Sequence, residues 1–253
     1  MNNRFEGRTV VVTGAGGGLG CDLARGFAAE GAELILTDMD QTLLTATESE
    51  LQKAGVKCSA YLLDLSVESD IHQVAKTIGY SHQNIHVLIN NAGIAFGEIS
   101  QSFAELNQTQ WLYYLSVNSV APVLLAQALR APLANAKGVV LNQSSMMSYV
   151  PTIAYGVTKA ALNAMTYGMA QAFASDNIRV NGIAPGYIDT PAAHANGTEA
   201  TRAYLLNMQA VKTTGSTDDI VKLARFLASD DARFITGETI SCDGGSTMKG
   251  WRA

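Results

Sequence analysis

Short runs of valine, isoleucine and leucine recur along the chain, and each is followed by a longer segment with the spacing of a helix. Several of the short runs are almost continuously apolar, which is typical of parallel strands that are covered on both faces. The pattern predicts strands at 8–14, 32–38, 57–64, 85–93, 138–145, 178–186 and 238–245. It predicts helices at about 18–30, 40–54, 67–80, 102–135, 152–174 and 216–229.

The regular alternation of strands and helices predicts an α/β fold with right-handed crossovers and a doubly wound parallel sheet. No Pro/Ser linker or change of composition interrupts the series, so we expect one domain over residues 1–253. The last helix has a start signal, because Ser216 can act as its N-cap and Asp219 follows three residues later. The segment 187–215 breaks the alternation after a strand end, and it is either a mobile lid over a ligand or an ordinary surface loop.

The composition favours a large core and argues against polyanionic partners. Apolar residues make up 47% of the chain and charged residues 15%. The net charge is −5, and no cluster of basic residues accompanies it. We therefore expect neither nucleic acid nor an anionic membrane surface as a partner.

Cysteine and histidine usage predicts a reducing compartment and no metal site. Cys21, Cys58 and Cys242 lie far apart without CxxC spacing, as expected for free thiols. The four histidines include no HExxH or paired-ligand pattern. The first residues run directly into a strand, and no apolar run reaches the roughly 18–20 residues of a membrane span. We expect a cytoplasmic protein.

The sequence TGAGGGLG at 13–20 joins the first predicted strand to the first helix. The spacing GxGxxG does not fit it, but the wider spacing TGxxxGxG does. Glycines let the backbone approach a pyrophosphate, and the following helix offers free N–H groups and a positive dipole end. A glycine-rich turn also occurs without a ligand, so the loop alone is weak evidence for a nucleotide site.

Asp38 strengthens the nucleotide hypothesis. It ends the second predicted strand, 18 residues beyond Gly20, about where a carboxylate meets the ribose hydroxyls of the adenosine. A carboxylate there repels a 2′-phosphate, and the glycine loop contains no Arg or Lys to attract one, which favours NAD over NADP. Alternatively, Asp38 is a solvated turn residue, and Asp40 could share or take over its role.

The stretch SSMMSYVPTIAYGVTKA at 144–160 places hydroxyl groups beside one lysine. In a helix, Tyr155 and Lys159 are four residues apart and project from the same face. A phenol with a pKa of about 10 is a poor base at neutral pH, but a nearby ammonium stabilises the phenolate and lowers that pKa. Such a tyrosine exchanges a proton with an alcohol or carbonyl oxygen while a hydride moves at carbon. Tyr149 has Ile153 at i+4 and no cation, so we assign it to the pocket wall or the loop.

Together these motifs resemble the compact type of the short-chain dehydrogenase/reductase family, over essentially the whole chain. The segments that carry the resemblance are TGAGGGLG (13–20), Asp38, LLDLS with Asp64, NNAG (90–93), VN with Asn118, SS…YGVTK, IRVNGIAPGYIDT (178–190) and ITGETISCDGG (235–245). The resemblance implies a Rossmann-like sheet of about seven strands with helices on both faces. It also implies an NAD-dependent oxidoreductase that interconverts a secondary alcohol and a ketone.

The resemblance further implies roles for individual residues. Tyr155 would be the acid/base, and Lys159 would lower its pKa and hold the nicotinamide ribose. Ser145 would polarise the substrate oxygen, and Asn118 would support a water in a proton relay. The implied cofactor site comprises Gly14, Gly18, Leu19, Gly20, Asp38, Asp64, Leu65, Asn90, Ala92, Gly93, Tyr155, Lys159, Pro185, Gly186, Ile188 and Thr190. The implied substrate site comprises Ser145, Met147, Tyr149, Tyr155 and Tyr187, with Met146 as a further candidate.

The chain departs from the family in the position of the serine. In many relatives the serine precedes the tyrosine by about thirteen residues, which here is Asn142. Ser145 stands only ten residues before Tyr155, so the intervening loop is shortened. The alignment of the strand VVLNQSS favours Ser145, with Ser144 as the alternative. We expect the shortened loop to reshape the substrate pocket.

Two other functions remain as alternatives. One is an NADPH-dependent reductase of the 3-oxoacyl carrier-protein type, and the other is a protein that binds NAD without turnover. The complete Ser/Tyr/Lys/Asn set argues against the second, because a pure binder has no need of a tuned phenol. The resemblance also implies a homotetramer, with which the apolar run 121–134 is compatible, although a core face has the same pattern. The few charges in the expected pocket favour a neutral or apolar alcohol as the small-molecule substrate.

Overall fold

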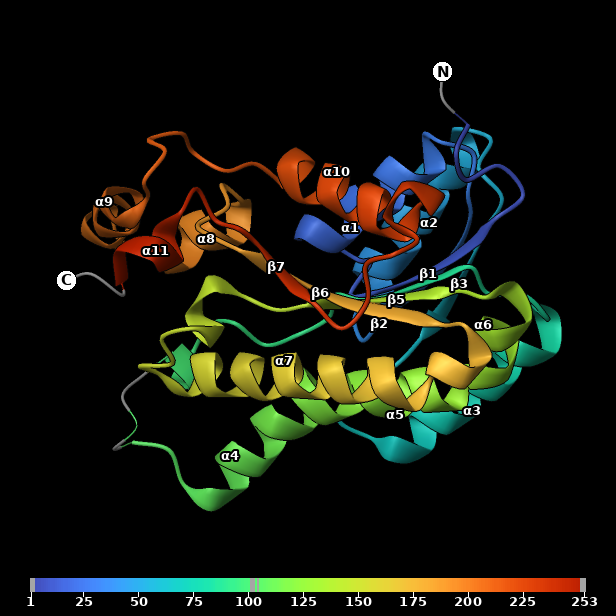
Figure 1. The fold of residues 1–253 in the computed structure, drawn as a ribbon, viewed down its shortest axis with the longest axis horizontal. Coiled ribbons are helices and arrows are strands. Elements are labelled where there is room, and N and C mark those ends of the chain that lie inside the picture. Colours follow the sequence, from blue (N-terminus) through green and yellow to red (C-terminus); the bar gives the residue numbers. More distant parts are fainter. Residues whose placement is uncertain (1–2, 101–102, 104, 251–253) are drawn as a thin grey trace.

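One parallel sheet runs through the centre of the molecule (Figure 1). The computed structural model describes residues 3–100, 103 and 105–250. Seven strands pair in the order β3-β2-β1-β4-β5-β6-β7, and every neighbouring pair is parallel. Their bounds are β1 Thr9–Thr13, β2 Glu33–Asp38, β3 Cys58–Leu62, β4 Val87–Asn90, β5 Val139–Gln143, β6 Arg179–Pro185 and β7 Thr239–Cys242. All seven predicted strands are confirmed, each somewhat shorter than predicted, as is the doubly wound α/β fold.

The strand order reverses beside β1. The chain builds β1, β2 and β3 outward in one direction, and then crosses back to place β4 on the other side of β1. The segments that leave the carboxyl ends of β1 and β4 consequently turn toward opposite faces of the sheet. A crevice opens at such a switch point, and ligands of open α/β sheets bind there.

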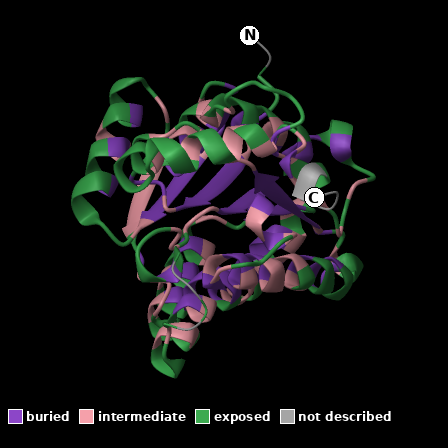
Figure 2. Cartoon of the chain, turned by 90° about the vertical axis from the view of Figure 1, so that its left-hand side faces the viewer, coloured by how far each residue is buried: buried purple, intermediate pink, exposed green. Residues whose placement is uncertain are grey.

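Helices cover both faces of the sheet, and the five central strands between them are mostly buried (Figure 2). Successive strand residues point to opposite faces. Val10 and Val12 therefore join the apolar cluster on one face, whereas Val11 joins the cluster on the other. The first face is covered by α1 Gly18–Ala28, α2 Gln41–Lys53 and α10 Thr217–Ala228. The second face is covered by α3 Glu68–Ser81, α5 Ala121–Ala128, α6 Arg130–Ala136 and α7 Ala154–Ala172.

The single helix predicted at 102–135 is wrong, because this segment is divided. Helix α4 Gln108–Leu115 starts at an Asn107/Gln110 capping box, and a π-helical turn at Ser116–Val120 separates it from α5. Residues 101, 102 and 104 lie outside the described part of the chain. Pro122 and Pro132 explain the irregularities, since a proline lacks the N–H that would bond the carbonyl four residues earlier. Pro122 falls after the π-helical turn and Pro132 after the bend at Leu129.

These divided helices also bear on the membrane question. Among the described residues, no single helix is long and apolar enough to span a membrane. The pair Gln108–Ala128 and Arg130–Ala136, bent by 64°, meets the requirement of length and composition only when the two parts are taken together.

The segment 187–215 contains two helices, α8 Pro191–Asn196 and α9 Glu199–Met208. Thr190 and Thr198 cap them, because each threonine hydroxyl accepts a hydrogen bond from a backbone N–H in the first helical turn. The two helices lie with α11 Ser246–Gly250 at the left of Figure 1. This is the side of the molecule where the chain leaves the carboxyl ends of β6 and β7.

Helix α10 begins as predicted and packs tightly on α1. The Ser216 hydroxyl accepts from the Asp219 N–H, and the Asp219 carboxylate accepts from the Ser216 N–H at 2.8 Å, which makes a capping box. A β carbon on Gly26 of α1 would lie 2.2 Å from Cγ1 of Val221. The two helices therefore approach each other so closely that a larger residue at 26 would force Val221 to move.

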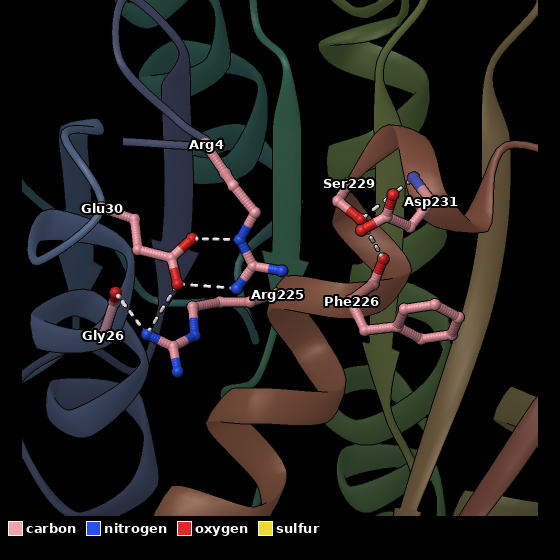
Figure 3. A network of polar contacts seen from close by, with 7 residues as sticks. All are labelled: Arg4, Gly26, Glu30, Arg225, Phe226, Ser229 and Asp231. Carbon is pink, nitrogen blue, oxygen red and sulfur yellow. Dashed lines mark hydrogen bonds and ion pairs between the residues drawn. The ribbon is translucent and has the colours of Figure 1, made fainter. Parts of the chain in front are cut away.

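An ion-pair cluster ties the same two helices to the start of the chain (Figure 3). Glu30, which is 8% exposed, accepts two hydrogen bonds of 2.6 Å from Arg4, and its Oε1 lies 3.0 Å from Arg225. The hydrogen bonds from Arg4 are the largest cause that holds the pKa of Glu30 below its ordinary value. Ser229 ends α10 nearby, since its hydroxyl donates to Phe226 O at 2.8 Å and accepts from the Asp231 N–H.

We expect Glu30→Gln to lower the free energy of unfolding at pH 7 by about 2 kcal/mol, because two arginines lose a charged acceptor. The depressed pKa makes this stabilisation complete above the ordinary glutamate pKa and removes it as the pH falls through the folded value. The difference between variant and wild type should therefore shrink below about pH 4. Urea unfolding at several pH values measures it.

Glu50→Gln is the matched control, because Glu50 pairs with Arg25 at 2.7 Å but its side chain is 52% exposed. Its cost should stay below about 1 kcal/mol. Equal costs for the two variants would contradict the role given to Glu30.

Candidate active site

A continuous depression lies at the carboxyl ends of the strands, beside the switch point. Its glycine-loop half, about 400 Å³, is bounded by the loop after β1 and the ends of β2 and β3. Its tyrosine half, about 600 Å³, is bounded by the segments after β5 and β6 and by residues of α8 and α9. Volumes of this size suit small-molecule ligands. Both halves share the wall residues Leu19, Asn91, Gly93, Phe96 and Thr190.

The loop after β1 brings the N-terminus of α1 to the depression. A β carbon on Gly20 would lie 1.9 Å from Gly14 O, so the first turn of α1 lies directly on the loop only because residue 20 is glycine. Gly17 occupies the N-cap and supplies no side-chain cap. The first N–H groups of α1 therefore remain available to an anion at the positive end of the helix dipole.

Asp38 lines the glycine-loop half at the end of β2. Its carboxylate accepts hydrogen bonds from Gly16 N at 2.8 Å and from Asp40 N at 3.0 Å. Asp40 does not share this role, because its carboxylate caps α2 by accepting from the N–H groups of Thr42 and Leu43. Among the described residues that line this half, none is Arg or Lys.

The structure corrects one residue of the expected cofactor site. The side chain of Asn90, which is 3% exposed, donates to Asn142 Oδ1 at 2.9 Å and to Pro122 O, and it does not line the depression. Asn90 still belongs to β4, and its side chain turns to the helix-covered interior. The next residue, Asn91, lines both halves and donates to Thr13 O at 3.0 Å. The two consecutive asparagines of NNAG are the feature of the sequence that could have indicated Asn91.

The other expected cofactor residues all lie on the wall. Those in the glycine-loop half are Gly14, Gly18, Leu19, Gly20, Asp38, Asp64, Leu65, Ala92, Gly93 and Thr190. Those in the tyrosine half are Tyr155, Lys159, Pro185, Gly186, Ile188 and, again, Leu19, Gly93 and Thr190. The segments after β1, β2, β3, β4 and β6, far apart in sequence, thus meet at one site.

Tyr155 and Lys159 project together from the first turns of α7, as the helical spacing predicts. Lys159 Nζ donates to Gln143 O, the last residue of β5, at 2.7 Å and lies 5.8 Å from the centroid of the Tyr155 ring. Lys159 is only 3% exposed. The buried ammonium therefore stands between the end of β5 and the tyrosine.

Burial governs the ionisation of both groups. It raises the pKa of Tyr155 to about 12, and the hydrogen bond from Ser145 opposes this rise. It lowers the pKa of the Lys159 ammonium to about 8. Burial thus leaves the pKa of Tyr155 above its ordinary value in this structure, and the lowering expected from Lys159 stays a prediction. Removing a phenolate from water costs more here than the neighbouring side chains return.

The geometry separates the two adjacent serines. Interaction with the Ser145 hydroxyl lowers the pKa of Tyr155, and the same hydroxyl accepts from Met147 N at 3.2 Å. The Ser144 hydroxyl instead donates to Asn163 Oδ1 at 2.6 Å. Asn142, at the spacing common among relatives, is 1% exposed and donates to Thr166 Oγ1 inside the core. Only Ser145 combines a place on the wall with contact to the tyrosine.

Asn118 lies in the π-helical turn, beneath the tyrosine half. Its side chain bonds both backbone groups of Ile94, at 2.8 and 2.9 Å, and donates to Thr158 Oγ1 at 3.1 Å. Asn118 thereby fixes the segment after NNAG to α7. π-helical turns are rare and occur often at functional sites.

The expected substrate residues divide between wall and interior. Met146, Met147 and Tyr187 line the tyrosine half. Tyr149 does not, because its hydroxyl donates to Thr239 O of β7 at 3.0 Å, so its expected contact with substrate is corrected. Phe96 and Ile153 also line this half and were missed by sequence reasoning. Asn196, Thr201 and Leu205 of the segment 187–215, a lid candidate from the sequence, line it as well.

Known proteins share this architecture over nearly their whole length. The family model described as Enoyl-(Acyl carrier protein) reductase matches residues 14–247. The 5-keto-D-gluconate 5-reductase of Escherichia coli K12 is 31% identical over 252 residues, which are 97% of this chain and 98% of that protein. The chain belongs to the short-chain dehydrogenase/reductase family.

Two solved structures of relatives contain different cofactors. A 7α-hydroxysteroid dehydrogenase complexed with NADH and a 7-oxo bile acid has a TM-score of 0.89 and 28% identity, and the match covers 96% of both chains. A putative gluconate 5-dehydrogenase of Beutenbergia cavernae with bound NADP has the same TM-score and identity, over 98% of this chain and 100% of that one.

The shortened loop of this short-chain dehydrogenase/reductase is closely packed. A 3₁₀ turn at Met146–Ser148 follows Ser145, and the chain then returns across the start of α7. A β carbon on Gly156 would lie 2.6 Å from Met147 O and 2.8 Å from the α carbon of Pro151. The loop can therefore close over α7 only because glycine follows Tyr155.

We expect Gly156→Ala to lower the free energy of unfolding by about 1–3 kcal/mol, since the new methyl group meets backbone atoms. Gly168→Ala is the control on the same helix, because nothing lies within 4 Å of its β position. That change should stabilise the protein by up to about 1 kcal/mol. Urea unfolding of both variants measures the difference, and equal effects would show that the loop is loosely held.

Proposed function

We propose that this short-chain dehydrogenase/reductase oxidises a neutral secondary alcohol with NAD and catalyses the reverse reduction of the ketone. The observation that carries the proposal is the joint placement of Ser145, Tyr155 and Lys159 on one wall, continuous with the loop that exposes the N-terminus of α1. NAD supplies the hydride acceptor when it is bound. The uncapped N-terminus and the carboxylate of Asp38 fit its pyrophosphate and ribose.

The protein groups would handle the proton and the substrate oxygen. The Ser145 hydroxyl would hold the oxygen beside Tyr155, and the phenolate of Tyr155 would take the alcohol proton during oxidation. In the reverse direction the neutral phenol returns the proton to the carbonyl oxygen. Lys159 would hold the nicotinamide ribose, and its positive charge would favour the phenolate. Asn118 would fix the segment after NNAG to α7 and would support the water of a proton relay.

We expect Tyr155→Phe to lower kcat by about 10²–10⁴-fold, because the group that exchanges the proton is removed. NADH binding, followed by fluorescence, should persist. Tyr80→Phe is the control, since that phenol is 88% exposed on α3 and lines neither half of the depression. Undiminished oxidation by Tyr155→Phe would refute the mechanism. A wild-type protein that binds NADH but turns over no alcohol would instead support the alternative of a non-catalytic binder.

NAD is preferred in this proposal because Asp38 opposes a 2′-phosphate and no described wall residue of the glycine-loop half supplies a cation for one. We expect wild type to favour NAD, and Asp38→Ser to reduce the ratio of kcat/KM for NAD over NADP by at least about tenfold, since a like-charge repulsion disappears. Initial rates with both cofactors measure this. Asp40→Ser, which keeps a capping residue at the start of α2, should leave the ratio unchanged. A wild-type preference for NADP would overturn the assignment.

The substrate is proposed to be uncharged. Among the described residues on the wall of the tyrosine half, Lys159 is the only one with a carboxylate, ammonium or guanidinium group, and Met146, Met147, Ile153 and Leu205 are apolar. We propose that 187–215 acts as the lid over this half, within a single-domain protein. Two other substrate classes compete with this proposal. Hydroxy acids are suggested by the relative that is named a 5-keto-D-gluconate 5-reductase, and 3-hydroxyacyl thioesters by the carrier-protein name of the family model. A screen of NADH formation across sugars, polyols, steroids and those two classes discriminates among them.

We also propose that the protein forms a homotetramer in the cytoplasm. Exposed Leu112 and Tyr113 of α4, Val120 beside α5 and Tyr167 of α7 support an assembly through these helices. The three free cysteines support a reducing compartment.

A further inference from the structure

Asn163 lies on α7 two turns beyond Tyr155 and one turn beyond Lys159, on the same side of the helix. It bonds two serines of the neighbouring loop. Its Oδ1 accepts from the Ser144 hydroxyl at 2.6 Å, and its Nδ2 donates to the Ser148 hydroxyl at 2.9 Å. The side chain does not line either half of the depression.

The bonds continue from Asn163 to Ser145. The Ser148 hydroxyl donates to Ser145 O at 2.6 Å, and the Ser148 N–H bonds the same carbonyl at 3.0 Å. A serine hydroxyl has one proton. Because Ser148 uses that proton on Ser145 O, it can only accept from residue 163, and Asn163 must therefore present its NH₂ group to Ser148.

We propose that Asn163 is the positioning residue that holds Ser145 at its catalytic place in the shortened loop. The inference rests on the role given to Ser145 in the proposed function. Residues 144–153 alone connect β5 to α7, so the shortened loop has few residues of its own to hold Ser145 in place. Asn163 compensates by fixing the residues on both sides of Ser145 to the helix that carries Tyr155.

The orientation of the Ser145 hydroxyl follows from the same turn. Met147 N donates to Ser145 Oγ at 3.2 Å, which occupies the acceptor side of that oxygen. The hydroxyl proton then remains for Tyr155 or for the substrate oxygen. The 3₁₀ turn that places Met147 N is the one that Ser148 closes and Asn163 holds. If this turn loosens, the Ser145 hydroxyl loses both its position and the direction in which its proton points.

The decisive experiment is a double-mutant cycle. Asn163→Ala and Ser148→Ala are each made in wild type and in Ser145→Ala, and kcat, KM and NADH binding are measured. Alanine suits a helix interior, so Asn163→Ala should preserve α7. Gln171→Ala truncates an exposed amide on the same helix and is the matched control.

In the wild-type background we expect Asn163→Ala to lower kcat by about ten- to a hundredfold, because a catalytic group is misplaced. Asn163→Ala should change the affinity for NADH by less than about twofold. Ser148→Ala should lower kcat as well. The Ser145 hydrogen bond favours the phenolate, so weakening it should move the rise of oxidation rate with pH to higher pH. Gln171→Ala should change neither kcat nor the pH profile.

In the Ser145→Ala background, Asn163→Ala should have no further effect on kcat. An equal loss in both backgrounds would show that Asn163 acts independently of the serine and would overturn the inference, as would an unchanged kcat in wild type. If Ser145→Ala itself retained full activity, the mechanism in the proposed function would fail first. If Asn163→Ala does not fold, Ser148→Ala in both backgrounds gives the same decision.

Discussion

The site depends on how α7 is held against β5. Two polar bonds cross an otherwise apolar contact, from Asn142 to Thr166 and from Lys159 to Gln143 O. A buried polar group costs free energy unless it is paired. Both bonds form only when α7 sits at one position along its axis relative to β5. That position decides where Tyr155 stands relative to the end of β5 and hence relative to Ser145. Lys159 therefore contributes to the architecture of the site as well as to its charge.

The strands could be predicted because parallel strands that are covered on both faces consist of almost continuously apolar residues. Most of the site followed from motifs at the strand ends. The break within 102–135 could not be placed, because apolar periodicity continues through Pro122 and Pro132 while the hydrogen bonds change. Asn90 and Tyr149 were misplaced for a related reason. A residue type at a strand end does not reveal whether its side chain faces the crevice or the interior, and the pairing that decides this is distant in sequence.

The pKa of Tyr155 shows a further limit of reasoning from spacing. The i, i+4 relation to Lys159 is correct, but it carries no information about burial, which raises the pKa of Tyr155 and lowers that of Lys159. The choice between Ser144 and Ser145 was likewise open until Asn163, 18 residues after Ser145, supplied a partner for one of them. Both questions turn on contacts between separate elements, which a local pattern does not encode.

The bond from Tyr149 to Thr239 O gives the loop a second attachment, on β7. β7 is the outermost strand, paired on one side only. The segment between Ser145 and Tyr155 is thus attached both to α7 and to the edge strand of the sheet. A displacement of that edge, whether by a neighbouring molecule or by a substitution in β7, would therefore shift the segment between Ser145 and Tyr155. The short loop would make the proposed chemistry sensitive to a surface that lies outside the pocket.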